Sequence, residues 1–280
     1  MIETMKIPKI IHYCWFGGNP LPETVHRCIE SWKRFCPDYE IKRWDESNYD
    51  VHTCDYTKEA YAAGKWAFVS DYARFEILYL HGGIYLDTDV EIIRPIDDIL
   101  KQGAWFGVEQ SDNGEILVNP GLGMAAEAGH PFYKRVLDQY ARIHFLNPDG
   151  TRNQTTVVKY ITDLLQESGL KEEAGIQCVE GIRLYPWDYF CPMEYRTGII
   201  SITPNTRAIH HYSASWLSKE EKRVHRVTRK ASHRFGPKAG MQIGRIYGLP
   251  YRIKKKIQEA GWRKTAKIAL RKILAEKHTS

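Results

Sequence analysis

The sequence predicts an α/β fold, with helices on both faces of a sheet and a basic helical extension at the C-terminus. Short apolar, β-favouring runs alternate with amphipathic stretches along the first three quarters of the chain, which is typical of α/β proteins. Glycine-rich breaks separate several of these runs. Positive charge gathers after residue 218, and the chain of 280 residues is long enough to bury a sizeable core.

The N-terminal elements follow from this alternation. Residues 9–17 (KIIHYCWFG) read as a buried strand that leads into a Gly-Gly turn. Residues 22–36 have apolar side chains at helical spacing, and residues 39–45 read as a second strand. A long helix is expected over residues 57–80, with Gly82 as a glycine C-cap.

A third strand is expected over residues 83–92 (GIYLDTDVEI), directly after that cap. The remaining expected elements are strands over 104–110 and 116–126, helices over 131–143 and 155–167, and two short segments over 182–186 and 208–213. No internal repeat interrupts this order, so we expect one continuous α/β body.

Composition excludes several protein classes. The N-terminus lacks the basic start and long apolar stretch of a signal peptide, and no run approaches the roughly 18 apolar residues of a membrane span. Six scattered cysteines contain no Cys-x-x-Cys pair, so a structural zinc site is not expected. We expect a cytosolic protein whose cysteines are reduced thiols.

The charge of the chain is unevenly distributed. Residues 219–280 hold 19 Lys and Arg against four Glu, a net charge of +15, so residues 1–218 carry −9 of the total of +6. We therefore expect two regions with different partners, an acidic body over residues 1–218 and a basic extension over residues 219–280.

Two aspartates interrupt the expected strand 83–92. Asp87 and Asp89 stand two apart, so on a strand both would point to the same face. Ligand sites of open α/β sheets lie beyond the carboxyl ends of the strands, and a divalent cation beside two such carboxylates relieves their repulsion. An isolated Asp-x-Asp is more often only a polar turn, so the motif needs support from its surroundings.

Upstream residues add some of that support. Asp71 and Arg74 lie three apart and share a face of the expected helix, where Arg74 could counter a phosphate or a carboxylate. An ordinary surface salt bridge is the alternative. Trp15, beside the Gly-Gly turn, offers a flat platform for a base, although a core tryptophan is about as good an explanation.

A downstream segment supplies further candidates. Residues 208–217 (AIHHYSASWL) contain His210, His211 and Trp216, which would suit a flap with a metal ligand and an aromatic lid. For either histidine alone, a structural role is the simpler interpretation.

Together, the segments IPKIIHYCWFGG, WAFVSDYARFEILYLHGGIYLDTDVE and IHHYSASW resemble the family 32 glycosyltransferases, which have a DXD sugar-binding motif. This group includes capsular polysaccharide and mannosyltransferase-like enzymes and is related to the glucosylating domains of large clostridial toxins. The resemblance covers roughly residues 6–218. It implies a GT-A fold, which is a Rossmann-like nucleotide-sugar-binding domain, together with a divalent metal and retention of anomeric configuration.

The resemblance also implies roles in donor binding. Trp15 resembles the residue that stacks on the nucleobase, and Tyr85 resembles a ribose or base contact. Asp71 matches a contact to the nucleoside or sugar, and Arg74 one to the donor phosphate or sugar.

The metal and catalytic roles come from the same resemblance. Asp87 resembles the contact to donor sugar and ribose near the metal, and Asp89 the direct metal ligand. His211 resembles a further metal ligand, and Trp216 the lid over the leaving diphosphate. We expect Asp87, Asp89 and Arg74 to be the catalytic group, with Mn²⁺ or Mg²⁺ as cofactor.

The expected function is metal-dependent retaining transfer of a sugar from a nucleotide sugar to a saccharide acceptor in cell-surface polysaccharide synthesis. UDP-sugar is the favoured donor. GDP-mannose stays open as the donor, and a lipid-linked oligosaccharide as the acceptor. The alternatives are a sugar-phosphate transferase, a host-protein-glycosylating effector and a nucleic-acid-binding module. No nucleic-acid partner is expected, because the basic tail lacks a recognisable motif and the body is acidic.

The tail leads to a further expectation. Residues 262–273 place apolar side chains, including Trp262, on one helical face and cations mostly on the other. Such a helix either packs on the body or lies on an anionic membrane surface. We expect the second, which would make the protein peripheral at the inner face of the cell membrane.

Overall fold

The computed structural model describes residues 7–110, 114–153, 155–213 and 217–260. These fall into two compact units. The first contains the described residues up to 193 and from 200 to 213, and the second contains 194–199 and 217–260. The domain boundary expected at residue 218 stays a prediction.

The first unit is built on one mixed sheet of eight strands in the order β2-β1-β3-β7-β5-β9-β8, with β6 paired to β5. Its strands are β1 (Ile10–Cys14), β2 (Glu40–Trp44), β3 (Gly83–Tyr85), β5 (Trp105–Gln110), β6 (Ile116–Val118), β7 (Met124–Ala126), β8 (Gln177–Val179) and β9 (Ile182–Tyr185). The first three strands are parallel, as helical crossovers allow, whereas β7 is antiparallel to both of its neighbours.

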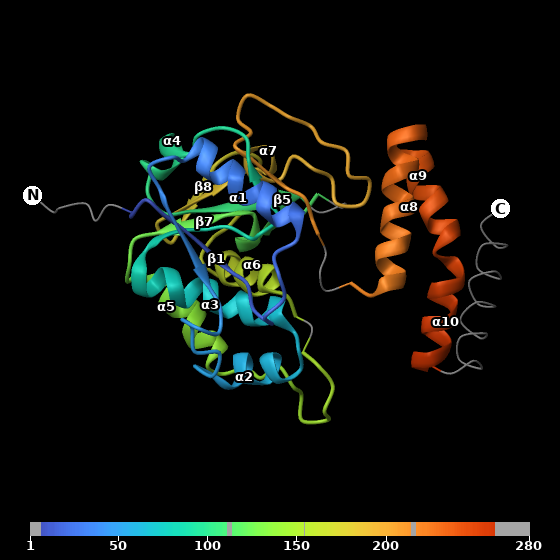
Figure 1. Cartoon of the computed structure of the whole chain (residues 1–280), viewed down its shortest axis with the longest axis horizontal. Coiled ribbons are helices and arrows are strands. Elements are labelled where there is room, and N and C mark those ends of the chain that lie inside the picture. Colours follow the sequence, from blue (N-terminus) through green and yellow to red (C-terminus); the bar gives the residue numbers. More distant parts are fainter. Residues whose placement is uncertain (1–6, 111–113, 154, 214–216, 261–280) are drawn as a thin grey trace, which may run out of the picture. The chain divides into compact units, whose positions relative to one another are not determined.

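Helices cover both faces of this sheet (Figure 1). Those of the first unit are α1 (Glu23–Phe35), α2 (Asp55–Ala62), α3 (Trp66–His81), α4 (Asp97–Leu100), α5 (Pro131–Tyr140), α6 (Val157–Glu167) and α7 (Trp187–Phe190). One buried cluster joins α2, α3, α5 and α6 to the sheet, and a second joins α1, α4 and α7 to the opposite face. Because successive side chains of a strand point to opposite faces, Ile84 lies in one cluster and Tyr85 in the other. The α/β class is confirmed.

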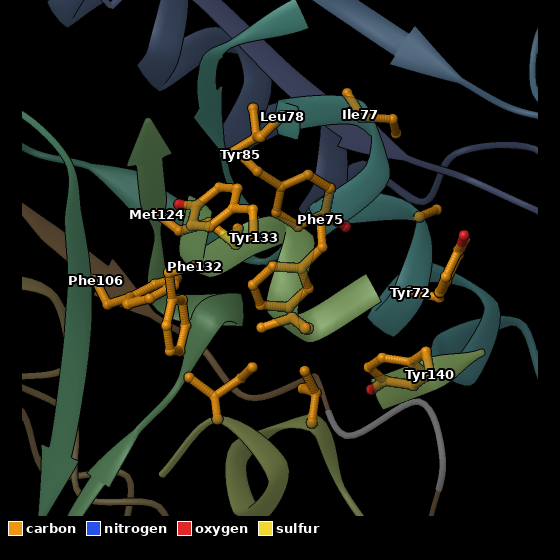
Figure 2. Close-up of a cluster of buried hydrophobic side chains, with 14 of the residues drawn as sticks. Tyr72, Phe75, Ile77, Leu78, Tyr85, Phe106, Met124, Phe132, Tyr133 and Tyr140 are labelled. Atoms are coloured by element: carbon orange, nitrogen blue, oxygen red, sulfur yellow. The ribbon is translucent and has the colours of Figure 1, made fainter. Parts of the chain in front are cut away.

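Aromatic side chains fill the core beneath α3 (Figure 2). The rings of Phe75 and Tyr133 meet edge to face with centroids 5.3 Å apart, and Tyr133 stacks on Phe106 at 5.7 Å. Such pairs contribute about 0.5–1.5 kcal/mol each beyond the area that they bury. The packing fixes the helix that carries Asp71 and Arg74.

The expected helix over residues 57–80 is wrong in one respect, because two helices occupy this stretch. Gly64, with φ of +64°, ends α2, and α3 begins at Trp66. A left-handed backbone at this position cannot continue a helix. The end of α3 is as expected, since Gly82 caps it with φ of +65° and donates its N–H to Leu78.

The expected strand over residues 83–92 is also two elements. β3 ends at Tyr85, and β4 (Val90–Ile92) pairs antiparallel with β10 (Ala208–His210) in a separate two-stranded sheet. The two aspartates therefore lie in the turn between β3 and β4, not on one strand.

The second unit is helical and basic, as expected for the extension. Its helices are α8 (Lys219–Phe235), α9 (Pro237–Tyr247) and α10 (Leu249–Ala260). Ser218 caps α8 through a reciprocal bond with Glu221. Among the described residues, none of the helices has the length and apolar character needed to cross a bilayer. The amphipathic stretch expected over residues 262–273 lies outside the described residues.

Candidate active site

The turn after β3 holds the acidic pair close to the backbone of its neighbours. The N–H of Asp87 donates to the carbonyl of Gly121 at 3.2 Å, and that of Val90 donates to the carbonyl of Asp87 at 3.0 Å. A Cβ on Gly121 would lie 2.2 Å from Oδ2 of Asp87, so only glycine fits there. The Asp-x-Asp is thus a polar turn, but one fixed at the end of a central strand.

A histidine completes a cluster with these two carboxylates. One ligand atom from each of Asp87, Asp89 and His210 lies within 4.8 Å of the others. The pairing of β10 with β4 sets His210 opposite Val90, next to Asp89. Its Nε2 is 3.1 Å from Oδ1 of Asp89, and the N–H of Ser213 donates to Oδ2 of Asp89 at 2.7 Å.

Charge in the cluster is unevenly shared. Burial by itself raises the pKa of Asp89, but His210 and the Ser213 N–H outweigh it and hold that pKa below its usual value. Burial lowers the pKa of His210, whereas the neighbouring carboxylates, Asp89 foremost, raise it above its usual value overall. Burial raises the pKa of Asp87, with Arg74 opposing. Asp89 is therefore the more strongly ionised carboxylate of the pair.

Arg74 links the acidic turn to helix α3. Its side chain is only 4% exposed, and its Nη2 lies 3.0 Å from Oδ1 of Asp71 and 3.3 Å from Oδ1 of Asp87. The hydroxyl of Tyr85 donates to the same Asp87 oxygen at 3.2 Å, and the guanidinium lies over the Tyr85 ring. This is a buried network and not the surface salt bridge considered above.

The residues expected to contact the donor differ in burial and in their partners. Burial raises the pKa of Asp71 to about 6, although Arg74 partly offsets it. Tyr85 is only 1% exposed and reaches Asp87, not the surface. Trp15 lies half-buried after β1, and its Nε1 donates to the carbonyl of Asn19 at 2.6 Å. Trp216 lies outside the described residues.

The two adjacent histidines face different carboxylates. Nε2 of His211 is 2.7 Å from Oε2 of Glu91, while its backbone N–H donates to the carbonyl of Asp89 at 2.9 Å. The structure thus brings His210, and not the His211 side chain expected from the resemblance, to the acidic pair.

Sequence reasoning missed a second polar group beside the cluster. Oε2 of Glu109, at the end of β5, accepts from the Tyr212 hydroxyl at 2.7 Å and from Nδ2 of Asn119 at 3.3 Å. Oδ1 of Asn119 accepts in turn from the N–H of Gly121, the glycine that supports Asp87. The stretch VNPGLG and the tyrosine after His211 were visible in the sequence, but only the strand pairing joins them.

The cluster fits a divalent cation. Two carboxylates and an imidazole are ligands that Mn²⁺ and related ions accept, and they converge from two segments over 100 residues apart. The close approach of two like charges at Asp87 and Asp89 is the situation that a cation stabilises.

Comparison with known proteins adds to this geometry. Residues 22–105, which include the Asp-x-Asp turn, match the family described as a glycosyltransferase sugar-binding region containing a DXD motif. The chain is 35% identical over 147 residues to inositol phosphoceramide mannosyltransferase 3 of Schizosaccharomyces pombe, a match that covers 51% of this chain and 40% of that protein. An uncharacterized glycosyltransferase of Acanthamoeba polyphaga mimivirus is 28% identical over 174 residues, with 58% and 65% covered.

Solved structures show weaker likeness. The match to the PaToxG glycosyltransferase covers 47% of this chain and 59% of that protein at 18% identity, with a TM-score of 0.37. The match to the galactosyltransferase LgtC, solved with donor and acceptor sugar analogs, covers 55% of this chain and 70% of LgtC at 16% identity, with a TM-score of 0.32.

The family match agrees with the acidic turn that the structure places at the end of β3, because residues 22–105 contain that turn. Residues 22–105 thus resemble the DXD-containing sugar-binding region of glycosyltransferases, and the curated relatives that the chain matches in part are named as a mannosyltransferase and a glycosyltransferase.

Proposed function

We propose that the protein transfers a sugar from a nucleotide sugar to a saccharide acceptor, with a divalent metal and retention of anomeric configuration. The observation that carries this proposal is the convergence of Asp87, Asp89 and His210 within 4.8 Å, with both aspartates inside the region that matches the family. Because the chain covers only 40% of its first curated relative, activity and substrates are proposals for this chain.

Asp89, Asp87 and His210 would hold the metal, which supplies positive charge against the departing diphosphate. Mn²⁺ is favoured over Mg²⁺, because Mg²⁺ prefers an all-oxygen set and one donor here is an imidazole nitrogen. Asp89 suits the role of direct ligand, since its pKa is held low and it stays ionised near neutrality.

Arg74 would act by orienting Asp87 and by adding a positive charge beside the donor. Its guanidinium is fixed by Asp71 and by the carbonyl of Ser70, to which Nε donates at 3.0 Å. A charge held in place before the reaction needs little reorganisation when negative charge develops.

The donor nucleotide is proposed from resemblance. UDP-sugar remains the first choice, because the sequence around Trp15 and the acidic pair resembles that of UDP-using relatives. Two relatives are named as mannosyltransferases, so a mannosyl donor such as GDP-mannose is the second choice.

The acceptor is proposed to be a saccharide, with cell-surface polysaccharide as its setting. The relatives' names refer to inositol phosphoceramide, a lipid-borne acceptor, which favours the lipid-linked form of that proposal for this chain. A protein acceptor, as for a host-directed effector, has no support in the described contacts. An acceptor screen that includes protein would reveal it.

A screen of UDP- and GDP-sugars with Mn²⁺, which follows release of free nucleotide, tests the proposal. Release of nucleoside diphosphate is expected, whereas release of nucleoside monophosphate would show a sugar-phosphate transferase. An Asp89→Ala protein that stays folded should lose Mn²⁺-dependent donor binding. Near-normal turnover by that variant would overturn the assignment of the metal site.

A further inference from the structure

The outer and inner faces of α9 carry opposite kinds of residue. Gly240 and Gly244 are buried against α8, where an added Cβ would lie 2.0 Å from Oγ of Ser232 and 1.8 Å from Oγ1 of Thr228. Gly248 continues this row, and its added Cβ would lie 3.0 Å from Val224. The face that packs on α8 is therefore built from glycines, and the large apolar side chains lie elsewhere.

Those large side chains form one stripe that runs from α9 into α10. The backbone stays helical at Gly248 (φ −80°, ψ −5°), which donates to Gly244 and accepts from the N–H of Arg252. The stripe consists of Ile243, Ile246, Leu249, Ile253 and Ile257. Intervals of three and four residues put them on one side of the helix, away from the glycine row.

The stripe is exposed, with fractions from 37% at Ile243 to 72% at Ile246. Single exposed isoleucines are common in soluble proteins, but a contiguous row indicates a surface that is covered by a partner. The arrangement is the reverse of an ordinary helical hairpin, which would bury its isoleucines and expose its small residues.

Charge identifies the partner. Residues 237–258 contain six cations and no acidic residue. Lys238, Arg245 and Arg252 recur every seven residues and follow one edge of the stripe, and Lys254 lies near the other edge. A second copy of this chain would bring the same positive charges to the seam, which disfavours self-association. An anionic bilayer complements both the apolar stripe and the charges beside it.

We propose that the surface formed by Ile243, Ile246, Leu249, Ile253 and Ile257, with its flanking cations, lies in the interface of an anionic membrane. The helices would lie in the plane of the bilayer with the stripe toward the acyl chains, since no described helix is long and apolar enough to span it. This site is distinct from residues 262–273, and membrane binding is measured without sugar transfer, so its test is independent of the proposed catalytic function.

The test is flotation of the full-length protein with vesicles of phosphatidylcholine, alone or mixed with phosphatidylglycerol, at low and high salt. Wild type should float only with the anionic mixture, and high salt should weaken binding. An Ile246→Ser/Ile253→Ser variant should bind at least about tenfold more weakly, because it removes two large apolar contacts. An Arg245→Gln/Lys254→Gln variant should lose about fivefold for each charge removed.

The matched control is Leu80→Ser, which alters an equally exposed apolar side chain in the other unit (62% exposed) and should float like wild type. Circular dichroism and thermal melts check that each variant is folded. Unchanged binding by the stripe variant, or equal loss in the Leu80 control, overturns the proposal. So does a dimer in sedimentation equilibrium that the stripe variant dissociates. Loss of binding only in a Trp262→Ala/Leu270→Ala variant would assign the membrane contact to the tail instead.

Discussion

Nε2 of His210 lies 3.1 Å from Oδ1 of Asp89, whereas the ring of its neighbour His211 lies 2.7 Å from Glu91. We therefore expect His210, but not His211, to act as a metal ligand. We expect His210→Ala to lower Mn²⁺-dependent turnover at least about 100-fold, because a ligand contributes several kcal/mol to the transition state. His211→Ala keeps the backbone N–H that donates to Asp89, so it should cost less than about tenfold.

Nucleotide release at several Mn²⁺ concentrations, with Mn²⁺ binding followed by electron paramagnetic resonance, compares the two variants. Thermal melts confirm that both are folded. A larger loss in His211→Ala than in His210→Ala would contradict the placement of the site.

Arg74 should matter for stability as well as for catalysis. Arg74→Met leaves Asp71 and Asp87 without their cation in a largely buried network. Breaking a buried pair in this way costs roughly 3–5 kcal/mol of unfolding free energy. Urea unfolding at neutral pH measures it, with Arg27→Met, at an exposed position of α1, as the matched control. A second substitution, Asp71→Asn, should restore part of the loss, and equal unfolding free energies for Arg74→Met and wild type would show that the network adds no stability.

The acidic pair and the helix that carries Asp71 and Arg74 could be predicted because each signal is local. The aspartates follow an apolar run, and the other two residues are one helical turn apart. The choice between His210 and His211 could not be made in this way. It depends on the register of β10 against β4, which joins segments over 100 residues apart and which a one-residue shift would reverse.

The same reason explains why Glu109 was missed, whereas the break at Gly64 was missed for a local reason. Glu109 reaches Tyr212 only because β5 ends beside the segment after β10. Gly64 sits inside a periodic apolar pattern, where its left-handed backbone has no sequence signal beyond the residue itself. Local patterns identified most strands and helices, whereas the pairing of distant segments determined the site.

His12 should make the stability of the fold depend on pH. Its Nε2 donates to the carbonyl of Gly82 at 3.0 Å, and its Nδ1 accepts from Nε1 of Trp44 at 3.0 Å. The ring is fully buried, and burial lowers its pKa to about 4. The unfolded chain takes up a proton below pH 6.5, but the folded protein does not until about pH 4. Stability is therefore unaffected above pH 6.5 and falls as the pH drops from 6.5 toward 4.

Between pH 7.5 and pH 5, this single group should cost about 2 kcal/mol of unfolding free energy. Urea unfolding across that range measures the slope. His12→Gln should be less stable at neutral pH, because it loses the Trp44 contact, but its slope should be shallower than that of wild type. His26→Gln, at an exposed position of α1, is the control. If His12→Gln and wild type have the same pH slope, His12 does not titrate in this way.

Gly244 should tolerate alanine poorly, against the usual trend in helices. Gly→Ala in a helix interior normally stabilises by about 1 kcal/mol. Here the new Cβ would lie 1.8 Å from Oγ1 of Thr228 and 2.8 Å from its Cβ, so α8 and α9 must move apart. We expect Gly244→Ala to destabilise the pair by about 1–3 kcal/mol, the usual cost of overpacking.

Faster hydrogen exchange in α8 and α9, with α3 unchanged, measures the effect. Gln242→Ala, two residues away on the exposed side of α9, is the matched control and should leave exchange unchanged. Slower exchange in Gly244→Ala would mean that the glycine row is not what sets the close approach of these helices.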